Sequence, residues 1–201
     1  MSDIQFVYFD LGGVLFNWKN AFRKLAVHID RSYDDLLRIV KKYDDDMCRG
    51  KIQPNQLLEY IRQELDVDIV LEDFFPWMSE NFTPILPMQH LLRQVAKKYH
   101  VGILTNIHNG SYEILVKKGF IPDIPYKTVI QSCELCLIKP EEKMFLHAQK
   151  KAGFPPSKIL FIDDMQENLN TAKELGWNIA LFEENHTQQS IRRIKKILGM
   201  N

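Results

Sequence analysis

Acidic side chains stand at two points of the sequence where a short apolar run ends. Asp10 follows the first run, and the pair Asp163 and Asp164 follows a later one. A carboxylate can attack phosphorus and form an aspartyl phosphate, which water then cleaves. Neighbouring carboxylates can hold Mg²⁺ against the phosphate oxygens and so reduce the repulsion between the two anions. These residue types at these positions indicate phosphoryl-group chemistry.

Two further positions supply groups that such a centre needs for the remaining phosphate oxygens. Thr105 and Asn106 end a third apolar run, and Lys139 precedes a predicted helix. A hydroxyl, a backbone amide and an ammonium group can hold the oxygens on which charge spreads in the transition state. Each residue taken alone has an ordinary interpretation as a turn, cap or surface residue. Their occurrence together, at strand ends that meet on one edge of a sheet, favours a binding site.

The elements that must position these residues are short apolar strands that alternate with helices. Strand-like runs occupy residues 4–9, 101–104, 128–130, 159–162 and 178–182. Helices are predicted at residues 88–99, 112–118, 166–175 and 188–198, and another is predicted to open at Pro140. Strands that are mostly apolar and separated by helices are typical of a parallel sheet covered on both faces. We therefore predict an α/β fold with a doubly wound parallel sheet.

The alternation is interrupted between the first strand and the remainder of the sheet. Helical periodicity without a strand pattern occupies residues 20–29, 33–43, 54–65 and 71–79. We interpret this stretch as a small helical-bundle cap inserted into the sheet domain. The predicted division is a core of residues 1–17 and 82–201 and a cap of residues 18–81.

Composition and charge exclude several other classes of protein. The chain has 201 residues, of which 45% are hydrophobic, and its 26 basic residues balance 26 acidic ones. A neutral chain has no large field that attracts nucleic acid or an anionic membrane, and no apolar stretch is long enough to span a bilayer. Cys48, Cys133 and Cys136 do not form a disulfide framework, and the lone Cys-x-x-Cys pair lacks the second pair of a zinc ribbon. We expect a cytoplasmic protein that acts on a small molecule.

The order of the sequence blocks resembles that of the haloacid dehalogenase superfamily of aspartate-nucleophile hydrolases. The blocks are FDLGGVL at 9–15, ILTN at 103–106, IKP at 138–140 and FIDDMQEN at 161–168. Each block is weak alone, whereas all of them in this order are specific. The insertion after the first block is similar to the small helical cap of one branch, which includes sugar phosphatases, 2-haloacid dehalogenases and the phosphatase domain of soluble epoxide hydrolases.

The resemblance implies a Mg²⁺ cofactor and a nucleophile. Asp10 would be the nucleophile and would hold Mg²⁺ together with the backbone carbonyl of Gly12 and the carboxylate of Asp164. Asp163 and Asn168 stand where many members carry glycine and a second aspartate. We predict that these two residues support the site from behind the metal ligands.

The resemblance also implies how the substrate phosphate is bound. Thr105 and the backbone amide of Asn106 would hold the phosphoryl group, and Lys139 would neutralise both the phosphate and the nucleophile. The implied activity is Mg²⁺-dependent hydrolysis of a small phosphorylated metabolite through an aspartyl phosphate.

Gly12 is the main departure from the family pattern. Members commonly carry a second aspartate here, whose side chain protonates the leaving group and then activates water. Glycine retains only the backbone carbonyl. General acid–base catalysis contributes about 10²–10⁴ in rate. We therefore expect slow hydrolysis of esters with poor leaving groups, and a smaller effect on sugar 1-phosphates, acyl phosphates or p-nitrophenyl phosphate.

The same glycine leaves two alternatives to a phosphatase. Metal-independent 2-haloacid dehalogenases of the superfamily also lack the second aspartate, but their last block resembles Ser-x-Asn, whereas this chain carries Asp163 and Asp164. A second carboxylate near the nucleophile is unfavourable without a cation between them, which favours the phosphatase. The other alternative is a catalytically weak phosphate-binding or regulatory protein on the same fold.

For residues of the predicted cap, contact with the substrate is a hypothesis. Trp18 lies where the chain leaves the nucleophile block, and Arg49 and Lys51 flank a glycine between two predicted helices. Small caps of this type close over the site and exclude water. We predict that Trp18 or Arg49 contacts the substrate. The simpler interpretation is that Trp18 is a packing residue and that Arg49 and Lys51 are solvated turn residues. Among the histidines, His108 stands closest to a candidate site residue.

Overall fold

We describe residues 3–71 and 74–200 in a computed structural model of the chain. The central sheet has the strand order β5-β4-β1-β6-β7, and its strands pair in parallel. Its members are β1 (Phe6–Phe9), β4 (His100–Thr105), β5 (Thr128–Gln131), β6 (Ile159–Asp163) and β7 (Asn178–Leu181). The first strand of the sequence therefore lies in the middle of the sheet, and the predicted parallel α/β fold is confirmed.

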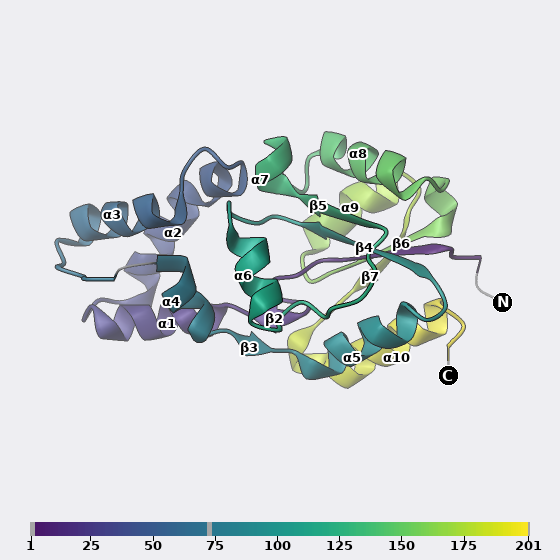
Figure 1. Ribbon diagram of the computed structural model, residues 1–201, viewed down its shortest axis with the longest axis horizontal. Coiled ribbons are helices and arrows are strands. Elements are labelled where there is room, and N and C mark those ends of the chain that lie inside the picture. Colours follow the sequence, from purple (N-terminus) through teal and green to yellow (C-terminus); the bar gives the residue numbers. More distant parts are fainter. Residues whose placement is uncertain (1–2, 72–73, 201) are drawn as a thin grey trace.

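Helices cover both faces of this sheet (Figure 1). One face carries α5 (Leu86–Val95) and α10 (Thr187–Ile197), and the other carries α8 (Glu142–Ala152) and α9 (Gln166–Glu174). Side chains of a strand point alternately to the two faces. Val7 and Phe9 pack on the α5–α10 side, and Phe6 and Tyr8 pack on the α8–α9 side. Both faces are buried, which explains why the first apolar run has no polar alternation.

A bundle of helices lies beside the sheet (Figure 1). Its members are α1 (Lys19–His28), α2 (Tyr33–Cys48), α3 (Pro54–Leu65) and α4 (Phe74–Glu80). They enclose an apolar cluster of their own, to which Leu25, Ile39 and Leu57 contribute fully buried side chains. The amphipathic periodicity of the segment thus serves to bury one face of each helix within the bundle.

Several helix boundaries differ from those that the sequence predicts. α2 continues past residue 43 to Cys48, because Met47 and Cys48 are buried and extend its apolar face beyond the intervening aspartates. α8 begins at Glu142, so Pro140 precedes the helix and does not open it. Of the predicted helix 71–79, residues 72–73 lie outside the described residues, and α4 accommodates Pro76 in its first turn, where the missing amide has no intrahelical partner.

Two short strands connect the bundle with the sheet domain. β2 (Phe16–Asn17) and β3 (Thr83–Pro84) pair antiparallel, and the amide of Ile85 donates to the carbonyl of Leu15 at 2.9 Å. The chain therefore leaves and re-enters the sheet domain at adjacent points. The division into a core and a cap stays a prediction, and these strands lie beside both of its boundaries.

The remaining elements are short. They are α6 (Ser111–Lys117), α7 (Ser132–Leu135) and two 3₁₀ turns, Pro156–Lys158 and Glu184–His186. Among the residues that the structure describes, no helix is both long enough and apolar enough to cross a bilayer.

Gly102 in β4 occupies a place where a methyl group does not fit. A Cβ there would lie 2.7 Å from Cε1 of Tyr8 and 2.8 Å from Cζ of Phe6. Overpacking of this kind costs about 1–3 kcal/mol. We expect Gly102→Ala to lower the free energy of unfolding in urea by this amount, while Lys150→Ala on the exposed side of α8 changes it by less than about 0.5 kcal/mol. A Gly102→Ala variant as stable as the wild type would contradict this packing.

Candidate active site

The carboxyl ends of β1, β4 and β6 bring candidate residues to one edge of the sheet. Asp10 directly follows β1, and its amide donates to the carbonyl of Ile162 in β6 at 3.0 Å. Thr105 and Asp163 are the last residues of β4 and β6, the two strands that flank β1. This is the edge at which open α/β sheets bind ligands.

Lys139 joins two of the carboxylates in a buried cluster of ion pairs. Its Nζ lies 2.9 Å from Oδ1 of Asp10 and 2.6 Å from Oδ2 of Asp163. The exposed fractions of the three side chains are 2%, 10% and 0%, in that order. Two carboxylates removed from water repel each other strongly unless a cation stands between them. The ammonium group therefore makes the close approach of Asp10 and Asp163 possible.

Asp163 is held by hydrogen bonds on both of its oxygens. Oδ1 accepts the amide of Met165 at 2.8 Å, and Nδ2 of Asn168 lies 3.1 Å from each oxygen. Lys139 donates to Oδ2, so both oxygens of the carboxylate accept hydrogen bonds. Asp163 thus orients the lysine, and Asn168 reaches the site through Asp163.

Asp164 faces the glycine loop that follows Asp10. A Cβ on Gly13 would lie 2.2 Å from Oδ2 of Asp164, and Gly13 has a φ of 80°, in the left-handed region that favours glycine. Carboxylate oxygens of Asp10, Asp163 and Asp164 all lie within 4.8 Å of one another. Hard oxygen donors in such a group suit Mg²⁺, and the bare backbone of Gly13 leaves the space that any side chain would fill.

Burial and crowding change the protonation of these groups. The pKa of Asp10 is raised to about 7, chiefly because burial disfavours the charged form; Lys139 opposes the rise, and Asp163 and Asp164 add to it. Burial and the neighbouring Asp163 raise the pKa of Asp164 to about 6. Burial acts to lower the pKa of Lys139, but Asp10 and Asp163 outweigh it, and the net direction is upward. A divalent cation beside Asp10 and Asp164 would favour the ionised form of both.

The end of β4 holds Lys139 in place through a side chain that sequence analysis did not assign to this task. Oδ1 of Asn106 accepts the amide of Lys139 at 2.8 Å, and its Nδ2 donates to the carbonyl of Lys139 at 3.0 Å. The sequence prediction used only the backbone amide of Asn106. Thr105 beside it is buried, with its Oγ1 donating to the carbonyl of Asn106 at 3.3 Å.

Trp18 lies against the glycine that replaces the second aspartate. A Cβ on Gly12 would lie 3.1 Å from Cδ1 and 3.3 Å from Nε1 of Trp18. The indole of Trp18 also packs edge-on against Phe22 of α1, with ring centroids 5.7 Å apart. The first residue of the predicted cap therefore directly reaches the glycine loop that follows Asp10.

Arg49 and Lys51 lie in the turn after α2, and both are engaged with protein groups. The guanidinium of Arg49 donates to the carbonyl of Cys136 at 3.1 Å and forms an ion pair with Glu141. Nζ of Lys51 lies 2.8 Å from Oδ1 of Asp46. Arg49 thus links the turn to the loop that carries Lys139, and its contact with a substrate stays a prediction.

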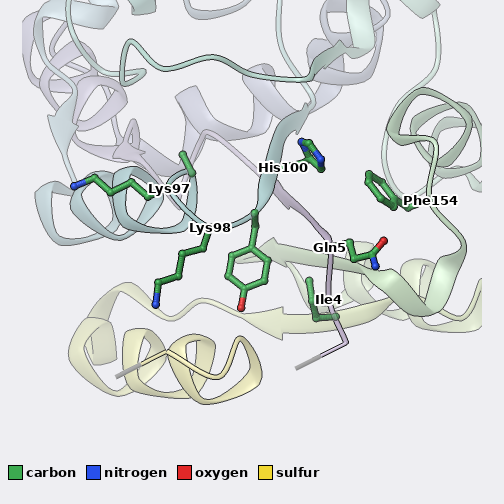
Figure 2. Close-up of a pocket in the computed structure, with 8 residues that line it drawn as sticks. Ile4, Gln5, Lys97, Lys98, His100 and Phe154 are labelled. Atoms are coloured by element: carbon green, nitrogen blue, oxygen red, sulfur yellow. The ribbon is translucent and has the colours of Figure 1, made fainter. Parts of the chain in front are cut away.

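Two cavities lie at opposite ends of the strands of the sheet. One, of about 560 Å³, is lined by Gly13 and Asp164, by residues of α1 and by the loop before α10. The other, of about 430 Å³, lies where β1 and β4 begin, and its lining includes Gln5, Lys98, His100 and Phe154 (Figure 2). Only the first of these two adjoins the carboxylate cluster.

Comparison with known families agrees with this arrangement. The haloacid dehalogenase-like hydrolase family matches residues 4–176, a span that runs from β1 through the helical bundle to α9. The chain belongs to this family of hydrolases, as the order of its sequence blocks predicts.

Curated relatives match at low identity. A sesquiterpene phosphatase of Aspergillus oryzae is 25% identical over 171 residues, which cover 84% of both chains. Acyl-CoA dehydrogenase family member 10 of Mus musculus is 22% identical over 71% of this chain but only 15% of its own length. Bifunctional epoxide hydrolase 2 of Rattus norvegicus is 28% identical over 35% of this chain and 12% of its own length. The chain thus spans a small part of the two larger relatives.

Solved structures share the fold. A HAD-like family hydrolase of Porphyromonas gingivalis has a TM-score of 0.76 with 18% identity and full coverage of both chains. A HAD family enzyme of Bacteroides thetaiotaomicron, in complex with magnesium and inorganic phosphate, has a TM-score of 0.67 with 22% identity, covering 91% of this chain and 96% of that one. L-2-haloacid dehalogenase of Xanthobacter autotrophicus has a TM-score of 0.69 with 17% identity, covering 96% and 82%.

Removal of the Lys139 charge tests the buried cluster. Lys139→Met leaves Asp10 and Asp163 buried without their cation, and loss of one partner from a buried pair costs about 3–5 kcal/mol. We expect this loss in the free energy of unfolding at neutral pH, measured by urea denaturation, and a smaller loss in acid, where the carboxylates are protonated. The exposed control Lys150→Met should change stability by less than about 0.5 kcal/mol. Equal effects of the two variants would contradict the cluster.

Proposed function

We propose that the chain is a Mg²⁺-dependent phosphatase that acts on a small phosphorylated metabolite in the cytoplasm. The observation that carries this proposal is the carboxylate group of Asp10, Asp163 and Asp164 at the sheet edge, with Lys139 buried among it. In this proposal Asp10 attacks the phosphorus, Asp163 anchors the lysine, and Asp164 faces the glycine loop. Such a division of tasks is what displacement at phosphorus requires.

In the proposed reaction Asp10 forms and then loses a covalent bond to phosphorus. A carboxylate oxygen of Asp10 attacks the phosphorus, and the bond to the leaving oxygen breaks with its electron pair on that oxygen. The leaving oxygen takes a proton from solvent. Water then attacks the phosphorus of the aspartyl phosphate and loses a proton to solvent, and the bond between phosphorus and the Asp10 oxygen breaks. Inorganic phosphate departs, and the carboxylate of Asp10 is restored. Lys139 opposes the rise in the pKa of Asp10 and favours its ionised form beside an anionic substrate. Thr105 with the amide of Asn106 would hold the phosphoryl oxygens.

The metal would be held by Asp10, the carbonyl of Gly12 and Asp164. Bound Mg²⁺ neutralises phosphate charge and polarises the phosphoryl oxygen. Asp163 is excluded from the ligand set because its oxygens are already occupied by Lys139, Met165 and Asn168. Asp10 is paired with Lys139 through Oδ1, and Asp164 faces the space that Gly13 leaves open.

The cavity beside Asp164 indicates the kind of substrate. Most of its lining is polar or charged, with Lys19, Asn20 and Arg23 of α1 facing the loop at 183–186. A leaving group that is rich in hydroxyls is complementary to such a lining, whereas a long hydrocarbon group is not. We therefore place sugar or polyol phosphates before prenyl phosphates, although one curated relative is a sesquiterpene phosphatase. The helical bundle would cover this side as a cap and exclude water.

Hydrolysis of p-nitrophenyl phosphate tests the proposed reaction. We expect Mg²⁺-dependent release of p-nitrophenol by the wild type, and a loss of at least about 10³-fold in kcat for Asp10→Asn, which removes the nucleophile. EDTA should abolish the activity, and added Mg²⁺ should restore it. The exposed control Asp3→Asn should retain wild-type rates. Halide release from 2-haloacids without metal, in place of phosphate release, would establish the dehalogenase alternative and refute the phosphatase.

The contact between Trp18 and Gly12 gives a second prediction about catalysis. Gly12→Asp alone should be destabilised and no faster, because the indole occupies the space beside the new side chain. Gly12→Asp combined with Trp18→Ala should gain up to about 10²-fold in kcat on a poor leaving group such as glycerol 2-phosphate, since it regains an acid. The matched control is Gly12→Ala with Trp18→Ala. Equal rates for the two double variants would show that the lost acid does not limit this reaction.

A further inference from the structure

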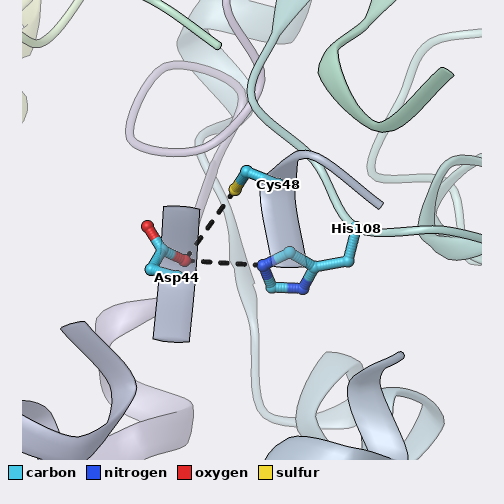
Figure 3. A group of neighbouring side chains, drawn as sticks. All are labelled: Asp44, Cys48 and His108. Carbon is cyan, nitrogen blue, oxygen red and sulfur yellow. Dashed lines mark hydrogen bonds and ion pairs between the residues drawn. The ribbon is translucent and has the colours of Figure 1, made fainter. Parts of the chain in front are cut away.

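Three side chains of metal-ligating type meet where the helical bundle contacts the sheet domain (Figure 3). Asp44 and Cys48 lie four residues apart on α2 and therefore on one helix face, and His108 lies in the loop that follows β4. Sγ of Cys48 lies 3.9 Å from Oδ1 of Asp44, and Nε2 of His108 lies 3.5 Å from the same oxygen. Their ligand atoms all lie within 4.8 Å of one another.

The separations fit a tetrahedral transition metal. Zn²⁺ binds thiolate sulfur at about 2.3 Å and imidazole nitrogen or carboxylate oxygen at about 2.0–2.2 Å. In a tetrahedron these lengths place sulfur about 3.5 Å and nitrogen about 3.4 Å from the oxygen. The separations of 3.9 Å and 3.5 Å differ from these values by a few tenths of an ångström, and the sulfur and the nitrogen lie within 4.8 Å of each other.

The donor set is different from that of the candidate Mg²⁺ site. Thiolate and imidazole select zinc over magnesium, whereas a group of carboxylates alone suits the harder ion. Cys48 is buried, His108 is half-buried and Asp44 is exposed, so protein encloses one side and solvent reaches the other. Water can therefore complete the coordination.

Hydrogen bonds between the helical bundle and the sheet domain fix the backbone around the three ligands. Oγ of Ser132 donates to the carbonyl of Cys48 at 2.6 Å and accepts the amide of Ile107 at 2.9 Å. Nδ2 of Asn109 donates to the carbonyl of Gly50 at 3.1 Å. These bonds hold the end of α2 against the 106–110 loop. A ligand set positioned in this way loses little conformational entropy on binding.

We propose that Asp44, Cys48 and His108 form a Zn²⁺ site that links α2 to the loop after β4. Binding replaces the thiol proton of Cys48 by the metal and releases that proton to solvent. Burial, together with Asp44 and Asp45, raises the pKa of the Cys48 thiol, and the charge of the ion compensates for these effects. Because the loop begins directly after Thr105, occupation of the site would restrain the helical bundle next to the proposed phosphate-binding residues.

Cobalt(II) substitution tests the proposal independently of enzymatic activity. Co²⁺ is added to the purified full chain in excess Mg²⁺, so that the carboxylate cluster is occupied, and the spectrum is recorded. We expect a thiolate-to-cobalt charge-transfer band in the near ultraviolet, visible bands of tetrahedral intensity and displacement of both by one equivalent of Zn²⁺. A carboxylate site cannot produce the charge-transfer band, because it has no sulfur.

Variants assign the band to these residues. His108→Ala and Cys48→Ser should abolish it and weaken Zn²⁺ binding by at least the roughly 10–100-fold that loss of a supporting contact costs. Cys136→Ser removes the exposed thiol and should leave both unchanged. Zn²⁺ should raise the melting temperature of the wild type but not that of His108→Ala, which keeps the buried Cys48 intact. Absence of the band in the wild type, its persistence in His108→Ala, or its loss only in Cys136→Ser would each overturn the proposal.

Discussion

The contact of the Lys139 ammonium with the carboxylates of Asp10 and Asp163 is the interaction on which the remainder of the site depends. The two carboxylates approach each other out of contact with water, and that approach is tolerable only with the cation between them. The lysine must therefore be fixed. Asn106 binds its backbone to the end of β4, and the amide of Met165 holds its partner Asp163. The ends of β1, β4 and β6 are thus joined through one residue, Lys139.

Much of this site could be predicted from the sequence, because parallel strands place their carboxyl ends together. Asp10, Thr105 and Asp163 follow apolar runs, and the sheet order could only bring such positions to one edge. The separate places of Asp163 and Asp164 could not be derived in the same way. Asp163 is the last residue of β6 and Asp164 follows it, and consecutive side chains of an extended chain point in opposite directions. Only the position of Lys139 in space determines which aspartate it contacts.

Contacts between the helical bundle and the sheet domain were beyond the reach of sequence patterns. Periodicity predicts the bundle helices, since each has a buried face, but it does not indicate what the end of α2 touches. The spacing of Asp44 and Cys48 places them on one face, while their neighbour His108 comes from a loop distant in sequence. The two-residue strands β2 and β3 are also too short to give an alternating pattern, yet they determine where the bundle is attached.

The glycine at position 12 and the tryptophan at position 18 are best understood as one structural feature. A side chain at position 12 would make a tight contact with the indole of Trp18, since a Cβ there would lie 3.1 Å from the ring. The family's acid could enter this loop only if the ring moved, and the ring also packs on Phe22 at the start of the bundle. The lack of an acid at position 12 is therefore coupled to the way in which the bundle approaches the nucleophile. The phosphatase that we propose would need substrates whose leaving groups depart without a proton from position 12, and the polar cavity beside Asp164 would select them.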